Sequence, residues 1–211
     1  MIECFSYGVL FNVHFDKPRH VRDSVPFPDE YIVGVAYGTT NPCVFLLIAI
    51  KHLGPGISQA WVEREYVYDS KARRRQKTDA EYADDMVSFI QPASIGSRPG
   101  VADIYIDPSA ASFKIELERK GLFQVKDANN DVNDGIRTVG RLLHQGRLRI
   151  ASECEHTIDE FEGYVWDAKK SAKGVEQPIK VADHCMDALR YALHTRFGSD
   201  SVLWTAAACT Y

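Results

Sequence analysis

The sequence predicts an α/β fold in which a mixed β-sheet is flanked by α-helices. Two observations support this prediction: three strands joined by short turns come early in the chain, and strands alternate with helices after them. Strands joined by short turns form an antiparallel meander, whereas a strand–helix–strand order favours parallel pairing. Of the 211 residues, 45% are apolar and 26% are charged, which is ordinary for one globular domain.

The predicted meander begins with a buried strand over residues 31–37. Residues 43–52 form a second strand that is rich in bulky apolar side chains. The turn GPG then leads into residues 59–69, where apolar and polar side chains alternate as in a half-exposed strand.

Helices and strands alternate after the meander. Thr78 and Glu81 form a capping-box pattern at the start of a helix that ends near residue 90. Further helices are expected over 109–120, 130–146, 156–164 and 180–197, and further strands over 102–108, 122–128 and 147–152. This order of elements is the pattern of a ribonuclease H-like fold.

Composition narrows the classes of partner. The formal net charge is −4, so binding to nucleic acid would depend on a local basic patch or on metal ions. Five scattered cysteines without CxxC spacing predict reduced thiols and no zinc site. No apolar run reaches the length of a membrane span, so no membrane partner is expected. The chain also lacks the GxxxxGK[ST] phosphate loop.

Three places in the chain could together form a metal site. Asp107 closes the predicted strand 102–108, while Ala36 ends the first strand, where many metal-dependent folds place a carboxylate. In the last helix, Asp183 and Asp187 are four residues apart and His184 is three residues before Asp187. These spacings allow the side chains to share one helix face.

Such acids are the groups that metal-assisted phosphodiester cleavage needs. Carboxylates from several elements hold two divalent ions about 3.5–4 Å apart, one for the attacking water and one for the leaving oxygen. Taken singly, each signal is weak, because an Asp before Pro commonly forms a turn and an Asp at a helix start commonly caps it.

Several stretches, in order, resemble a known family. They are GVAYGTTNP near the first strand end, IDPSA at 106–110, and DHCMDALRY at 183–191. The chain is similar over residues 30–197 to the C-terminal nuclease domain of the large terminase subunit of tailed double-stranded DNA bacteriophages.

The resemblance implies an endonuclease that cuts concatemeric double-stranded DNA with two Mg²⁺ or Mn²⁺ ions. It also implies an N-terminal ATPase domain, a small terminase subunit and a portal as partners, in the host cell cytoplasm. Residues 1–28 are then expected to be a junction from the ATPase domain, 29–198 the nuclease domain, and 199–211 a C-terminal tail.

The resemblance also assigns site residues. The family's first acid falls at Ala36 and its second at Asp107, and its late metal-binding group falls among Asp183, His184 and Asp187. We favour Asp183 and Asp187 as carboxylate ligands and His184 as a ligand or proton shuttle. At Ala36 an engineered Asp→Ala exchange is the favoured explanation, and natural loss is the other. Such a chain should fold but cut DNA little.

Two groups of basic residues are predicted to contact DNA phosphates. One consists of Arg73, Arg74, Arg75 and Lys77, and the other includes Lys169 and Lys170. The alternative for each is a solvated loop. Arg190 is expected to pair with a nearby acid and Tyr191 to pack in the core.

Three other functions deserve comparison. A non-catalytic DNA-binding or assembly module would carry Ala36 as its native residue. An actin-like or sugar-kinase ATPase also has a GTT loop after a strand, but it needs a second half that this chain does not show. A junction resolvase on the same fold would prefer four-way junctions to linear duplex.

Overall fold

The computed structural model describes residues 15–38, 41–122, 124–165, 178–179 and 182–199. In these residues, seven strands form one sheet in the order β1-β7-β4-β3-β2-β5-β6. The strands are β1 Val21–Arg22, β2 Glu30–Ala36, β3 Cys43–Gly54, β4 Ile57–Tyr68, β5 Val101–Ile106, β6 Val125–Asp127 and β7 Leu148–Ala151. The predicted meander β2-β3-β4 is antiparallel and every other pair is parallel, which confirms the mixed sheet.

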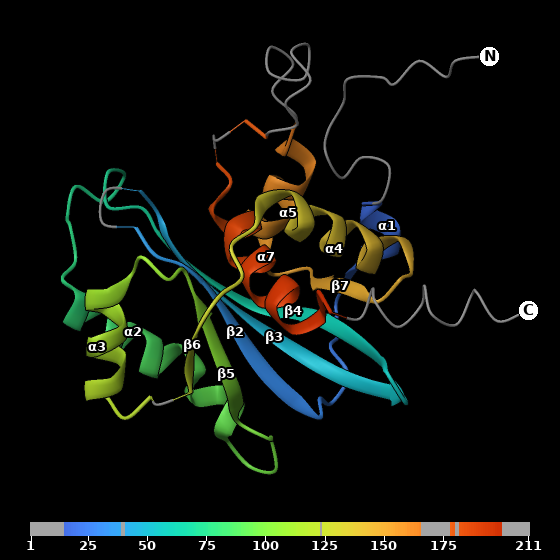
Figure 1. The fold of residues 1–211 in the computed structure, drawn as a ribbon, viewed down its shortest axis with the longest axis horizontal. Helices are drawn as coiled ribbons and strands as arrows, with labels where there is room; N and C mark the ends of the chain where they lie inside the picture. The colour runs from blue at the N-terminus through green and yellow to red at the C-terminus, as the bar shows by residue number, and fades with distance from the viewer. Residues whose placement is uncertain (1–14, 39–40, 123, 166–177, 180–181, 200–211) are drawn as a thin grey trace, which may run out of the picture.

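Helices cover both faces of this sheet, as predicted. They are α1 Lys17–His20, α2 Asp79–Ile90, α3 Ala111–Arg119, α4 Val132–His144, α5 Glu155–Gly163 and α7 His184–Phe197, with a 3-10 turn η1 at Gln91–Ser94. Figure 1 shows α2 and α3 together on one face and α4, α5 and α7 on the other.

Each face of the sheet has its own apolar core, because side chains alternate along β2. Ile32 and Ala36 face the core under α4, α5 and α7. Tyr31, Val33 and Val35 face the core under α2 and α3. The strand is therefore buried on both sides, which explains its continuous apolar sequence.

Gly34 lets α7 approach the backbone of β2. A Cβ atom at Gly34 would lie 2.1 Å from the carbonyl oxygen of Ala188 and 3.0 Å from Cβ of Ala192. Such a contact is impossible, so only glycine fits while α7 keeps this position. The close contact places the second and third turns of α7 over the carboxyl half of β2.

Local sequence signals explain where two helices begin. The Thr78–Glu81 capping box at α2 is present in both directions, as predicted. The last helix was expected from residue 180, but α7 begins at His184. Residues 180–181 lie outside the described residues.

The N-terminal segment contributes to the sheet. Residues 1–28 were expected to be a junction, of which 1–14 lie outside the described residues. Val21 and Arg22 nevertheless pair in parallel with β7. The ring of Phe15 stacks on that of Phe161 in α5, with 4.7 Å between centroids. A two-residue strand has no sequence periodicity, which is why this pairing was not predicted.

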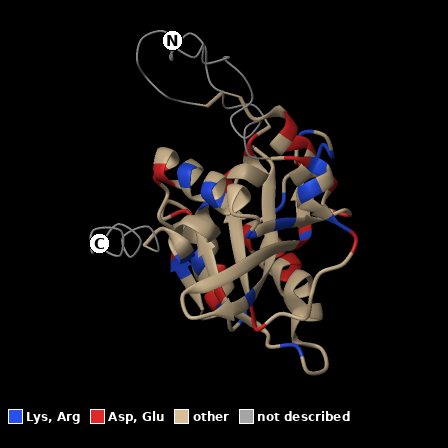
Figure 2. Cartoon of the chain, turned by 90° about the vertical axis from the view of Figure 1, so that its right-hand side faces the viewer, with Lys and Arg blue, Asp and Glu red and all other residues tan. Residues whose placement is uncertain are grey.

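Charges of both signs are mixed over the molecule. In Figure 2 the Lys and Arg positions are interspersed with Asp and Glu positions, in keeping with the small net charge. Among the described helices, none combines the length and apolar character that crossing a membrane requires.

Candidate active site

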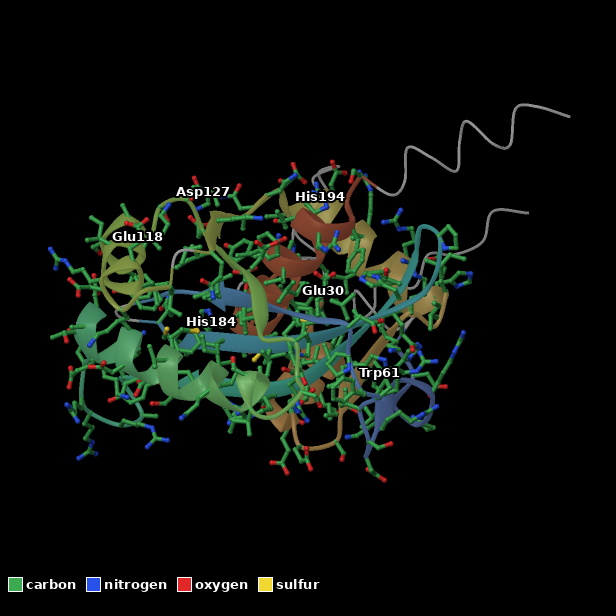
Figure 3. The ribbon with its side chains drawn as sticks, turned by 90° about the horizontal axis from the view of Figure 1, so that it is seen from below. Glu30, Trp61, Glu118, Asp127, His184 and His194 are labelled. Carbon is green, nitrogen blue, oxygen red and sulfur yellow. The ribbon has the colours of Figure 1, made fainter. Side chains whose placement is uncertain are left out.

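A polar pocket of about 280 Å³ opens at the carboxyl end of β2. It is lined by Ala36, Tyr37, Gly38, Asn41, Pro42, Asp107, Ser109, Asp183, His184, Asp187 and Tyr191. The five predicted site residues therefore meet in one place, supplied by the ends of β2 and β5 and the start of α7. Figure 3 labels His184 and His194, which lie in the first and last turns of that helix. The roles of these residues remain predictions.

Ala36 and Asp107 are neighbours across two parallel strands. Val35 pairs with Ile106 in the β2–β5 register, so the next residue on each strand lies at the same level. Adjacent strands are about 4.8 Å apart, and side chains alternate between faces. Ala36 faces the core below α7, and Asp107 contacts Tyr191 of α7. A carboxylate at position 36 would therefore be on the same side of the sheet as Asp107.

The Asp107 carboxylate is held by donors from three residues. The Ser109 N–H donates to Oδ1 at 2.8 Å, while the Asn130 amide at 3.3 Å and the Tyr191 hydroxyl at 3.0 Å donate to Oδ2. Burial alone would raise the pKa of Asp107, but the hydrogen bonds from Ser109, Asn130 and Tyr191 outweigh it and hold the pKa below its usual value. Asp107 is thus ionised at neutral pH.

Asp187 forms a buried ion pair. Nη2 of Arg190 lies 2.5 Å from its Oδ1, and the Arg190 side chain is only 3% exposed. Burial would lower the pKa of Arg190, but the charge of Asp187 overcomes this and raises it. The expectation that Arg190 pairs with a neighbouring acid is confirmed.

Asp183 and His184 occupy the start of α7. Asp183 is the N-cap residue and is 4% exposed, but its side chain makes no capping hydrogen bond to the helix. His184 is half-buried and lines the same pocket. Both residues therefore contribute polar atoms to the pocket beside Asp187.

The donor chemistry of the pocket suits a hard divalent cation, since Mg²⁺ and Mn²⁺ prefer carboxylate oxygens. The arrangement is incomplete, however. Within the described ranges, no three His, Cys, Asp or Glu side chains are placed so that they could hold one metal ion. Asp107 and Asp187 accept hydrogen bonds from Tyr191 and Arg190, and a methyl group stands at Ala36.

The predicted basic loop begins beside the pocket. Tyr68 ends β4 and pairs with Cys43, which follows the pocket-lining Asn41 and Pro42. The guanidinium of Arg73 lies 5.5 Å from the Tyr68 ring centroid.

The four predicted DNA-binding residues of this loop differ in their partners. Arg75 pairs with Glu81, and Lys77 pairs with Asp85. Arg73 and Arg74 form no ion pair with any described residue. The second group, Lys169 and Lys170, lies outside the described residues.

Tyr191 was expected only to pack in the core. Its ring is indeed buried, at 9% exposure, but its hydroxyl reaches the pocket and holds Asp107. Burial raises the pKa of Tyr191, so the phenol remains a proton donor. The spacing of four residues from Asp187 was the available signal, because it places both side chains on one helix face.

The sheet order, the helices on both faces and the acids at the ends of the central strands define the class of protein. It is a ribonuclease H-like domain with its polar pocket at the carboxyl edge of β2 and β5.

Comparison with known proteins narrows this class. Residues 124–195 match the family described as "Terminase RNAseH like domain". The chain is 26% identical over 199 residues to the large terminase subunit of Escherichia phage T5, covering 89% of this chain and 42% of that protein. The solved large terminase of a thermophilic bacteriophage is 38% identical, with a TM-score of 0.80 over 89% of this chain and 44% of that one.

A third relative, also a solved structure, shares the fold at lower identity. It is the large terminase nuclease domain of bacteriophage SPP1 with bound Mn, which is 19% identical with a TM-score of 0.58. The match covers 83% of this chain and 94% of that domain.

These findings identify the chain as carrying the nuclease-type domain of a phage terminase large subunit. It spans less than half the length of the phage T5 protein and of the thermophilic phage terminase.

Proposed function

We propose that this domain is a metal-dependent endonuclease for double-stranded DNA, and that the present chain is impaired at Ala36. The observation that supports the proposal best is the meeting of Ala36 with Asp107, Asp183, His184 and Asp187 in one pocket. These residues come from three elements, as a cluster of oxygen ligands requires.

In this proposal Asp107, Asp183 and Asp187 are the carboxylate ligands, and His184 is a further ligand or a proton shuttle. Two divalent ions would supply an activated water and stabilise the leaving oxygen. The SPP1 nuclease domain was crystallised with Mn, which favours Mn²⁺ or Mg²⁺ here. Tyr191 would orient Asp107, and Arg190 would orient Asp187.

The position of Ala36 explains why cleavage should be weak. The methyl side chain of Ala36 cannot bind a metal ion. A carboxylate at this position would stand next to Asp107, and the two could bind the same ion. Ala is small and apolar, so the buried strand tolerates it. An engineered exchange of Asp for Ala remains the favoured origin, with natural loss as the alternative.

DNA would approach across the pocket mouth and the loop after β4. Arg73 and Arg74 are the better phosphate contacts, because Arg75 and Lys77 already pair with acids. Lys169 and Lys170 remain a proposed second contact.

The proposed setting is genome packaging in the host cell cytoplasm. The motor would also hold an ATPase domain, a small terminase subunit and a portal. Residues 29–198 would form the main part of the nuclease unit of that machine, with 1–28 leading into it from the ATPase domain and 199–211 as tail. The relatives from phage T5 and from the thermophilic phage, which are longer terminase proteins, support this arrangement.

The test is to make Ala36→Asp and to measure plasmid cleavage and Mn²⁺ binding. We expect on the order of 100-fold faster cleavage than in the unchanged chain, because loss of a single group that stabilises a transition state electrostatically typically costs about 10²–10³ in rate. Ala36→Asn is the matched control, since it adds a similar volume without the negative charge and should stay inactive.

Other outcomes would identify another function. A folded Ala36→Asp chain that binds duplex DNA but neither binds Mn²⁺ nor cuts would contradict the proposal and indicate a non-catalytic module. ATP binding would favour the actin-like alternative. Strong preference for four-way junctions would favour a resolvase.

A further inference from the structure

The start of α7 is capped by a residue from another helix. Glu160 of α5 accepts a hydrogen bond from the backbone N–H of Met186 at 3.0 Å. The N–H of Cys185 also bonds to this carboxyl group. Glu160 thus satisfies two of the N–H groups that every helix leaves unpaired in its first turn.

A second carboxylate serves α5 in the same way. Glu65 of β4 accepts from the N–H groups of His156 and Thr157, both at 2.9 Å, and from the Thr157 hydroxyl at 2.7 Å. The N-cap residue of α5, Cys154, makes no side-chain cap. Two carboxylates in succession therefore fix α5 to the sheet and α7 to α5.

This arrangement matters for Asp183. An Asp at the N-cap position ordinarily turns its carboxylate back onto the N–H groups of its own helix. Here Asp183 makes no such bond, and it lines the pocket with Asp107 and Asp187. The N–H groups it would otherwise use are those that Glu160 occupies.

We propose that Glu160 is a positioning residue: by capping α7 from α5, it keeps the Asp183 carboxylate directed at the pocket. The inference rests on the proposed metal-dependent function of that pocket. Glu160 itself lines a different pocket, of about 520 Å³, with His156 and Ile179. It does not line the proposed site, so its hydrogen bonds reach that site through the start of α7, while its charge also acts on Asp183 directly.

The first measurement needs no metal. Amide hydrogen exchange of Cys185 and Met186 is compared in the unchanged chain, Glu160→Ala, Glu160→Gln and the control Asp159→Ala. Asp159 is the exposed neighbour of Glu160 on the same helix. We expect faster exchange at both amides only in Glu160→Ala. Gln keeps the length of Glu160 and an oxygen that accepts hydrogen bonds, so it is the conservative substitute.

The second measurement is Mn²⁺ affinity by calorimetry in the Ala36→Asp chain. Loss of an outer partner of a metal ligand typically weakens binding about 10–100-fold, and we expect about 10-fold for Glu160→Ala. Glu160→Gln should restore most of the affinity, and Asp159→Ala should not change it. If Glu160 acts through Asp183, its removal should have no further effect once Asp183→Asn is present. A purely structural role would not give this coupling.

The outcomes separate the two proposals. Unchanged exchange in Glu160→Ala, or unchanged Mn²⁺ affinity in a folded Glu160→Ala chain, overturns the positioning role alone. The positioning role is also overturned if Glu160→Ala lowers the Mn²⁺ affinity by the same factor in a chain that already carries Asp183→Asn. If Ala36→Asp with Glu160 intact neither binds Mn²⁺ nor cuts, the proposed function fails, and the positioning role fails with it. Thermal unfolding checks that each variant is folded. If Glu160→Ala does not fold, Glu160→Gln takes its place: faster exchange at Cys185 and Met186 with unchanged Mn²⁺ affinity overturns the positioning role, and protected amides with retained affinity support it.

Discussion

Asp187 combines a structural role with its proposed catalytic one. Its Oδ1 atom pairs with the buried guanidinium of Arg190, which also donates to the carbonyl oxygen of Asp131 at 3.2 Å. A buried cation needs this partner, because an uncompensated charge in the interior is costly. Asp107, by contrast, is held by neutral donors at the pocket rim.

The two acids should therefore respond differently to the same change. Asp187→Asn should lower the free energy of unfolding by on the order of 3 kcal/mol, because it leaves Arg190 charged and buried without its anion. Asp107→Asn should cost only about 1 kcal/mol, since the amide oxygen keeps one side of these bonds and the Tyr191 hydroxyl can accept from the amide N–H on the other. Urea unfolding at pH 7 measures both. Equal stability of the two variants would show that the Asp187–Arg190 pair is not structural.

At this scale the sequence predicts charged residues better than their neutral partners. Asp107, Asp183 and Asp187 stand at a strand end and at helical spacing, and these are local patterns. The hydroxyl of Tyr191 bonds to a residue 84 positions away. The cap from Glu160 spans 26 positions. Such contacts depend on how elements pack, which no short stretch of sequence encodes.

Among the elements, β2 and α7 together determine the geometry of the pocket. They meet at Gly34, where the α7 backbone lies too close for any side chain. Because α7 carries Asp183 and Asp187, a small shift of this helix would move two of the proposed ligands relative to Asp107.

Gly34→Ala should force that shift. We expect a loss of on the order of 3 kcal/mol in unfolding free energy, as overpacking against backbone atoms costs about 1–3 kcal/mol or more. In the Ala36→Asp chain it should also weaken Mn²⁺ binding. Gly54→Ala is the control, because nothing lies within 4 Å of a Cβ there. If the two variants unfold at the same urea concentration, the close contact at Gly34 is not what holds α7.

Elements with a strong pattern can be predicted, and short ones cannot. The alternation in residues 59–69 and the capping box at Thr78 correctly indicate β4 and α2. The four-residue α1 and two-residue β1 are too short for any periodicity. They form because tertiary contacts with β7 and α4 stabilise them.

At the scale of the whole molecule, residues 15–28 pack against the rest of the domain. His20 is fully buried, and its Nε2 atom lies 3.1 Å from the carbonyl oxygen of Leu143 at the end of α4. Phe15 stacks on Phe161, and Val21 pairs with Ile150 at the sheet edge. These contacts tie the segment to three separate elements. The predicted boundary at residue 29 would remove all of them.

A chain of residues 29–199 should therefore be less stable than one of residues 15–199. We expect a difference of on the order of 3 kcal/mol or more in urea unfolding at pH 7.5, because buried aromatic and apolar contacts are lost. The uncovered edge of β7 should also promote aggregation.

The difference in unfolding free energy between the 15–199 and 29–199 chains should become smaller at acidic pH. Burial lowers the pKa of His20, so the unfolded chain binds its proton first. The stability that the segment adds is complete above the unfolded value of about 6.5 and falls as the pH drops through it. In the 15–199 chain, His20→Gln should flatten this pH dependence. If the 15–199 and 29–199 chains are equally stable at pH 7.5, the folded unit begins at residue 29. Residues 15–22 would then add nothing to its stability.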